Sequence, residues 1–203
     1  MSKTSKSILI FLTICLVFAV GICRYITLND RYYDSADYST VLFEMGEIIP
    51  FGENYLNTDV CFNGYSIRVD RFEIVDTESY LSSLSNYTGN TESTAPEKLA
   101  LVYITLFNEN SDAEGVMLTE IGFHSFYYYA TMDWNSLTLL NSVLKVGYGV
   151  SLSPGTSYEL ILPFALYEHY SAPDTWEHLD TCTFNLHITS YPIEKDVLLT
   201  QMD

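Results

Sequence analysis

The side chains best suited to metal binding or acid–base catalysis belong to four histidines: His124, His169, His178 and His187. No two of them lie four residues apart, and the sequence contains no Cys-x-x-Cys pair, so the spacing typical of a zinc site is missing. We therefore expect no metal site and no cofactor. His187 lies in a strand-like alternation, on the side opposite to the apolar residues, which predicts an exposed position.

Two adjacent acid–histidine pairs, Glu168-His169 and Glu177-His178, flank residues 170–176. Neighbouring side chains of an extended chain point to opposite faces, so we favour simple surface exposure for both pairs. The sequence also lacks a Gly-x-Ser-x-Gly nucleophile elbow and a glycine-rich phosphate loop. We expect no catalytic residues and no enzymatic activity. The alternative is a small-ligand-binding, carbohydrate-binding or hydrolytic domain that uses a cleft near residues 167–180.

An aromatic run, Phe126 to Tyr129, followed by Trp134, is the best candidate for contact with a ligand or partner. In a strand, Tyr127 and Tyr129 share one face, while Phe126 and Tyr128 share the other. If this run binds, Tyr127, Tyr129 and Trp134 form the predicted site, a flat aromatic surface suited to sugar rings or a protein. In the interpretation that we favour, these rings pack under a loop or along a sheet edge.

The compartment of these residues depends on an apolar segment, Ile8 to Cys23, which follows two lysines and ends at Arg24. A bilayer core requires about 20 apolar residues, and basic side chains at both ends can extend a shorter run by snorkelling. We predict a cytoplasmic N-terminus over residues 1–7 and an uncleaved transmembrane helix, or signal anchor, over residues 8–24.

A cleaved signal peptide is the main alternative, because its apolar core is about 7–15 residues long. Ala19-Val20-Gly21 offers small residues to a peptidase, but the apolar run continues beyond them, which favours the anchor. Since lysines precede the segment, the positive-inside rule places the rest of the chain outside the cell. We predict a single-pass protein of the cell membrane with an extracellular ectodomain, or a secreted protein if the segment is cleaved.

The exported part is strongly acidic. All 26 acidic residues lie from Asp30 onward, together with only six basic residues. Such a charge repels nucleic acid and anionic lipid surfaces, so we expect no nucleic acid and membrane contact only through Ile8 to Cys23. The expected partner is an unidentified protein or a component of the cell envelope.

Cys61 and Cys182 are the two cysteines outside the apolar segment, in a compartment expected to be oxidising. A disulfide between them would close a very long loop and stabilise the fold by about 4–5 kcal/mol. Two buried, unpaired thiols are equally compatible with the sequence.

The pattern of the exported part favours strands. Residues 25–40 are polar and rich in tyrosine, which predicts a stalk ahead of a domain over residues 41–203. Leu99 to Phe107 is apolar on both faces, as expected of the central strand of a covered sheet. Within residues 65–74 the alternation changes parity once, which predicts a β-bulge.

About seven or eight short strands separated by turn signals predict an all-β fold, specifically an Ig-like β-sandwich. Other strands are expected over residues 41–49, 181–189 and 196–200, and short helices near residues 78–84, near 137–144 and from residue 175 or 176.

The order of several short motifs resembles that of known families. These motifs are Met45-Gly46-Glu47, Gly64-Tyr65, Leu99 to Phe107 with Asn108-Glu109-Asn110, Leu152-Ser153-Pro154-Gly155, Leu162-Pro163-Phe164 and Thr189-Ser190-Tyr191-Pro192. Together with the apolar helix and the stalk, they resemble uncharacterised membrane-anchored or secreted Ig-like ectodomains of Gram-positive bacteria, known as domains of unknown function. The resemblance implies an Ig-like sandwich outside the cytoplasm and assigns no site residue. We expect a non-enzymatic module that makes protein or cell-envelope contacts.

Overall fold

The computed structural model describes residues 13–25, 39–55, 62–89, 95–109, 115–125, 128–144, 149–171 and 173–201. The chain divides into two compact units, residues 1–38 and 39–203. In the first unit, residues 13–25 are helical. Within the described part of the chain, no helix combines the length and the apolarity that a membrane span requires. Residues 8–12 of the predicted span lie outside the described residues.

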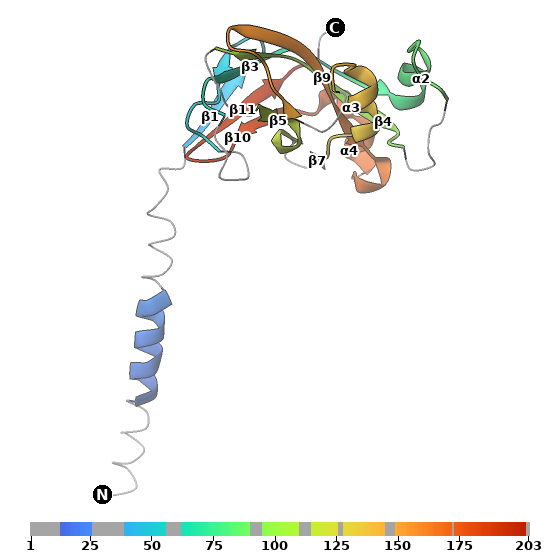
Figure 1. Cartoon of the computed structure of the whole chain (residues 1–203). Helices are drawn as coiled ribbons and strands as arrows, with labels where there is room; N and C mark the ends of the chain where they lie inside the picture. The colour runs from blue at the N-terminus through green and yellow to red at the C-terminus, as the bar shows by residue number, and fades with distance from the viewer. Residues whose placement is uncertain are drawn as a thin grey trace, which may run out of the picture. The chain divides into compact units, whose positions relative to one another are not determined.

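The second unit is mostly β-structure, as the sequence predicted (Figure 1). The strands are β1 (Ser39–Glu44), β2 (Ile49–Pro50), β3 (Tyr65–Asp76), β4 (Lys98–Asn108), β5 (Val116–Met117), β6 (Gly122–His124), β7 (Tyr129–Ala130), β8 (Gly149–Val150), β9 (Thr156–Leu166), β10 (Phe184–Thr189) and β11 (Ile193–Leu199). The helices are α2 (Thr77–Ser82), α3 (Trp134–Leu140) and α4 (Pro173–Glu177), and short 3₁₀ turns cover Leu118–Glu120, Glu168–Tyr170 and Leu179–Thr181.

These strands form two main sheets. One has five strands in the order β1-β11-β10-β6-β7, and the other has four in the order β2-β3-β4-β9. Strands β5 and β8 form a separate short pair. In the four-stranded sheet, the antiparallel β3–β4 ladder shifts register between Val69 and Arg71, so the predicted bulge is confirmed.

Strand β4 lies inside the four-stranded sheet, between β3 and β9, and is buried on both faces, as its apolar run predicted. On one face, Val102 and Ile104 enter the main core. On the other, Leu99 and Leu101 pack with Leu81 of α2 in a smaller cluster. An aspartate caps the N-terminus of α2 and of α3. Asp76 accepts a hydrogen bond from the Ser79 amide, and Asp133 accepts one from the Ser136 amide. These helices begin earlier than predicted because the caps fix their first turns.

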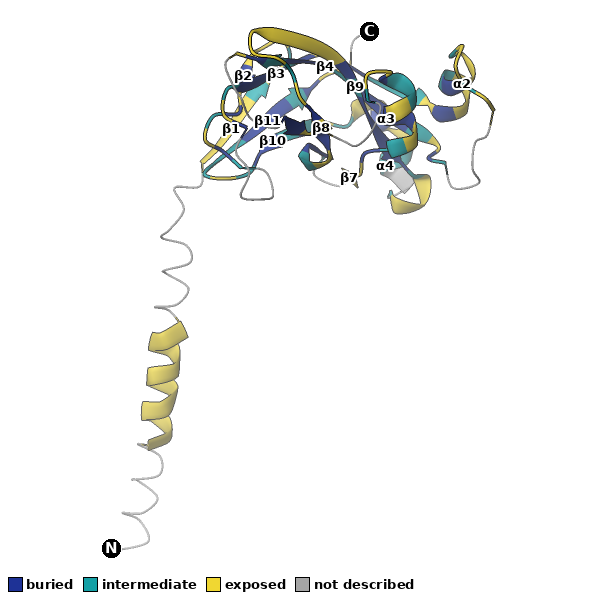
Figure 2. Cartoon of the chain, in the orientation of Figure 1, coloured by how far each residue is buried: buried dark blue, intermediate teal, exposed yellow. Residues whose placement is uncertain are grey.

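The five-stranded sheet also contributes residues to the main core. In β10, the alternation confirms the prediction, because Phe184, Leu186 and Ile188 are all buried. The ring of Phe123 in β6 stacks on that of Phe184 and on that of Phe164 in β9, with both centroid distances 5.0 Å. Since β9 belongs to the other sheet, these rings connect the two sheets. Buried residues occur in the strands of both sheets (Figure 2).

The start of the domain differs from the prediction. Residues 39 and 40, assigned to the stalk from the sequence, belong to β1, and the single strand expected over residues 41–49 is two short strands. Gly46 causes the break, because its φ of 89° suits glycine and turns the chain between β1 and β2. Strand β1 then pairs in parallel with β11, from Ser39 opposite Ile193 to Glu44 opposite Leu198.

Candidate functional site

Two histidines and one aspartate from three adjacent strands meet on the outer face of the five-stranded sheet. His124 ends β6, His187 lies in β10 and Asp196 lies in β11. His187 and Asp196 are direct cross-strand neighbours, while Asn185 lies opposite His124. Because strand side chains alternate between faces, these groups point away from the core that Leu186 enters.

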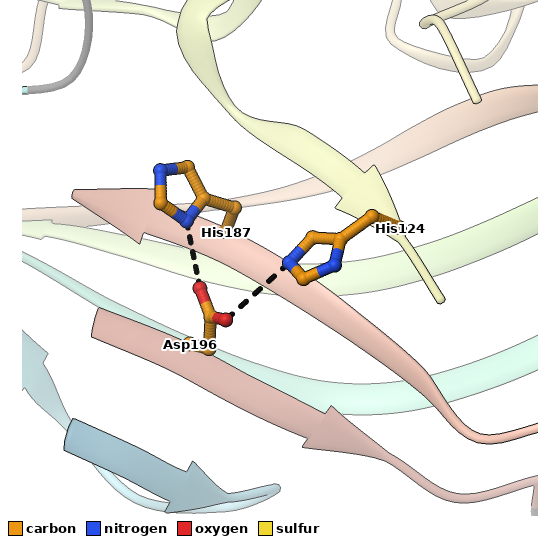
Figure 3. Close-up of side chains that lie close together, drawn as sticks. All are labelled: His124, His187 and Asp196. Carbon is orange, nitrogen blue, oxygen red and sulfur yellow. Dashed lines mark hydrogen bonds and ion pairs between the residues drawn. The ribbon is translucent and has the colours of Figure 1, made fainter. Parts of the chain in front are cut away.

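The two imidazoles contact different oxygens of the same carboxylate (Figure 3). His187 Nδ1 lies 2.7 Å from Asp196 Oδ1, and His124 Nε2 lies 3.3 Å from Asp196 Oδ2. The other nitrogen of the His187 ring, Nε2, lies 2.7 Å from Ser190 Oγ. One donor atom from each of His124, His187 and Asp196 lies within 4.8 Å of the other two.

Asp196 is the electrostatic centre of this cluster. Its side chain is only 7% exposed, and the ion pairs described for it are both with imidazoles. A buried carboxylate is costly unless a positive charge or hydrogen bonds compensate for the water it has lost. The two imidazoles that contact it line a surface recess of about 330 Å³, together with Glu120, Gly122, Tyr129, Ser190 and Glu194. Among these described lining residues there is no lysine or arginine.

Lys195 follows Glu194 and precedes Asp196, but its ammonium group does not serve the recess. Lys195 is buried, and its Nζ donates hydrogen bonds to the carbonyl oxygens of Pro50 and Phe51. Burial lowers the pKa of Lys195 below its ordinary value. The strand alternation therefore sends the cation inward and leaves the carboxylates on the outer face.

Two features of the backbone make room for His187. Gly122 lies directly opposite it on β6, and a Cβ at Gly122 would lie 3.2 Å from His187 Cβ. Glycine thus allows the imidazole to lie against β6. The β10–β11 register also shifts between His187 and Thr189. Such bulges redirect side chains and often occur beside functional sites.

The arrangement is chemically suited to a transition-metal ion. Two imidazoles and a carboxylate are common ligands of zinc and related ions. Glu194 Oε1 lies 3.7 Å from His187 Nδ1 and offers a further oxygen donor. In the described part of the chain, the buried Oδ1 of Asn185, opposite His124, accepts no hydrogen bond. A cation held by these donors would place a positive charge beside the buried Asp196 carboxylate.

The residues of the predicted aromatic site have different surroundings in the structure. Tyr129 is 71% exposed and lies opposite His124 on β7, at the recess. Tyr128 points inward, as predicted, and burial raises the pKa of its hydroxyl. Trp134 packs partly buried against the core, so it does not extend an exposed aromatic surface. Tyr127 lies outside the described residues.

The loop near residues 167–180 contains a cluster of rings. His169 and Tyr170 have centroids 4.0 Å apart, and Tyr170 is 73% exposed. Lys98 Nζ lies 5.2 Å from the centre of the Trp176 ring. His169 and His178 are both exposed, in agreement with the surface role that we favoured. Cys182 is a free thiol that packs partly buried against the core, and its expected partner Cys61 lies outside the described residues.

The His124–His187–Asp196 cluster was not expected from the sequence. His187 does face away from the core, as predicted, but it is half-buried because the residues of β6 and β11 flank it. One signal could have found part of the cluster. A hairpin that turns at Ser190 to Pro192 places His187 beside Asp196, because the two residues lie at similar distances from the turn. Nothing comparable links His124 to this hairpin.

Comparisons with known proteins give one match. Neither the curated proteins nor the solved structures include a match to this chain. A family model for a domain of unknown function, DUF5028, matches residues 40–195, which include His124 and His187 and end one residue before Asp196. The match covers all of β1 except Ser39 and most of the second unit. The resemblance to an uncharacterised domain family is thereby confirmed, and the chain belongs to the DUF5028 family.

Proposed function

We propose that this protein is a membrane-anchored, extracytoplasmic module whose domain binds a divalent transition-metal ion through His124, His187 and Asp196. The observation that carries the proposal is the buried Asp196 carboxylate, whose described ion-pair partners are two imidazoles. Imidazole favours zinc, copper, nickel or iron over magnesium and calcium, which prefer oxygen ligands. A zinc ion, or a related ion, would be held by His124, His187 and Asp196, whose side chains already lie close together.

The outward location is supported by sequence chemistry. The lysines that precede Ile8 to Cys23, and the acidic character of the chain from Asp30 onward, favour an anchored domain outside the cytoplasm. Outside the cytoplasm, the metal site would bind ions from the extracellular medium. N-terminal sequencing of the mature protein tests the anchor: a retained N-terminus supports it, while a start at Ile22 contradicts it.

An Ig-like sandwich is the architecture we propose for the domain. The orders β3-β4-β9 and β11-β10-β6 correspond to the A-B-E and G-F-C orders of an immunoglobulin fold, and β7 takes the place of C′. The ring contacts between Phe123 and Phe164 support face-to-face packing. In this assignment, β1 and β2 are additions at the sheet edges. The module would then act by contacts with a protein or the cell envelope, with exposed Tyr129 at the recess as one contact point.

Calorimetric titration of the purified, chelator-stripped full-length chain with Zn²⁺ at neutral pH tests metal binding. We expect one site per chain, little response to Mg²⁺, and a loss of affinity of more than about 100-fold in His187→Ala, since a direct ligand matters more than an outer-shell group. His178→Ala is the matched control, because His178 is an exposed histidine outside the recess. Absence of zinc binding, or equal affinity in the two variants, would contradict the proposal.

A further inference from the structure

Glu194 connects the candidate metal site to the strand at which the domain begins. Thr40 Oγ1 in β1 donates a hydrogen bond of 2.6 Å to Glu194 Oε2. The second oxygen of the same carboxylate, Oε1, lies 3.7 Å from His187 Nδ1. The two oxygens of Glu194 therefore face two structures: β1 on one side and the metal ligands on the other.

Apart from its ladder with β11, strand β1 is attached mainly through a few side chains. It lies at the edge of the five-stranded sheet, with β11 as its neighbour, and five of its six residues are exposed. Phe43 is the exception, packing partly buried against the core. Elements with little buried apolar surface open locally at a low free-energy cost. Among the described residues, the hydrogen bond from Thr40 is the side-chain link that adds to this ladder at the start of β1.

Glu194 is also the most suitable fourth ligand. Structural zinc sites are almost always tetrahedral, and His124, His187 and Asp196 supply three donors. Ligating carboxylates are themselves usually hydrogen-bonded, and this outer shell orients them. If Oε1 bound the metal, Oε2 would keep its hydrogen bond from Thr40. Glu194 would then link the metal to β1 through its two oxygens.

We propose that metal binding at this site is coupled to the docking of β1, through Glu194 and Thr40. This inference rests on the proposed metal-binding function. Linkage makes the coupling reciprocal: if docked β1 raises metal affinity by a given factor, bound metal favours docked β1 by the same factor. Strand β1 follows directly on the residues that join the domain to the predicted anchor. Metal binding would therefore stabilise the docking of the strand through which the domain is connected to that anchor.

Two measurements on the full-length chain test the coupling. In Thr40→Val, which removes the hydroxyl but keeps the shape, we expect zinc affinity to fall about tenfold, within the range known for outer-shell groups. Thr40→Ser restores a hydroxyl and should keep the affinity within about twofold of the wild type. In the wild type, saturating zinc should slow hydrogen exchange of the β1 amides about tenfold, whereas in Thr40→Val it should not.

The results separate the two proposals. Three results together support the coupling. The wild type binds zinc, Thr40→Val binds zinc more weakly, and zinc slows hydrogen exchange of the β1 amides in the wild type. Normal zinc affinity in Thr40→Val, or unchanged β1 exchange, overturns the coupling and leaves the metal site intact. No zinc binding by the wild type overturns both. Thermal unfolding in chelator provides the baseline, because a general loss of stability in Thr40→Val would also be seen without metal.

Discussion

The outer faces of the two sheets balance their charges in opposite ways. On the four-stranded sheet, Arg68 pairs with Asp70, and Arg71 pairs with Glu73, each within β3. The Arg71 guanidinium also lies over the ring of Tyr103, 4.8 Å from its centre. This face therefore contains the cations that its carboxylates need.

On the five-stranded sheet, the ion pairs described for Asp196 are with imidazoles instead of arginines. The described residues around the recess include Glu120 and Glu194, beside the buried Asp196, and no lysine or arginine. On this face histidines pair with a carboxylate, whereas on the other face arginines do so. Imidazole is a metal ligand and guanidinium is not, so the proposed metal site belongs on the histidine face.

The largest effect should come from disrupting the strand that supports both faces. Ile104→Asp places a charge in the core beneath β4 and should destabilise the domain by several kcal/mol, with loss of zinc binding as well. Ser157→Asp is the control, since Ser157 is exposed on the neighbouring strand β9. Urea unfolding measures both. Similar midpoints for the two variants would mean that β4 does not carry the core.

On the arginine face, Tyr103→Phe should destabilise the domain by about 1–2 kcal/mol, because Tyr103 donates a 2.6 Å hydrogen bond to Glu73. Tyr158→Phe, at an exposed tyrosine of the same sheet, is the control. Zinc affinity should be unchanged in both. A weakened zinc site in Tyr103→Phe would contradict the independence of the two faces.

The same tyrosine predicts a dependence on alkaline pH. Burial, and then the hydrogen bond with Glu73, raise the pKa of Tyr103 above its ordinary value of 10.0. The stabilisation is complete below about pH 10 and is lost as the pH rises further, since the unfolded chain releases this proton first. Melting temperatures from pH 8 to 11 should therefore fall more for the wild type than for Tyr103→Phe. An equal fall would show that Tyr103 does not contribute.

On the histidine face, Gly122→Ala should weaken zinc binding by roughly 3- to 10-fold, because the added Cβ would press on His187 at 3.2 Å and shift its ring. Calorimetric titration measures the change. Gly155→Ala is unsuitable as a control, because Gly155 has a positive φ. Ser157→Ala, on the other sheet, serves instead. Unchanged affinity in Gly122→Ala would show that the ring position is not critical.

The smallest effect should be that of Arg68→Gln. The Arg68 and Asp70 side chains are 35% and 32% exposed, so solvent and salt screen their attraction. We expect a loss of less than about 1 kcal/mol in dilute buffer, and almost none at 1 M salt. Unfolding at two salt concentrations tests this. A large loss that persists in salt would mean that the packing of Arg68 over Phe107, rather than its charge, supports this face.

Local pattern predicted much of the fold. The apolar run at β4, the parity change at the β3 bulge and the alternation of β10 each depend on neighbouring residues, which the sequence displays directly. The break at Gly46 was missed because a glycine can be accommodated within a strand, and only its φ shows that it turns the chain. The turn at Gly46 therefore depends on the packing of the whole domain and cannot be read from neighbouring residues.

The candidate site was missed for a different reason. His124 lies far from His187 in the chain, and the order of strands brings them together, with β6 adjacent to β10. Strand order depends on how the sheets pack, and alternation carries no information about it. The hairpin of β10 and β11 was accessible from the sequence, but a single His–Asp pair gave no reason to expect a second imidazole.

The parallel pairing of β1 with β11 has a mechanical consequence. In this ladder the chain enters at Ser39, opposite Ile193, and its C-terminal end leaves beyond Leu199, at the other end of the pair. A force that draws the two termini apart therefore runs along the strands and tries to slide one past the other. All the interstrand hydrogen bonds then share the load, whereas an antiparallel pair pulled from one end would open bond by bond. If the proposed anchor is present, this geometry would help the domain to resist being pulled away from it.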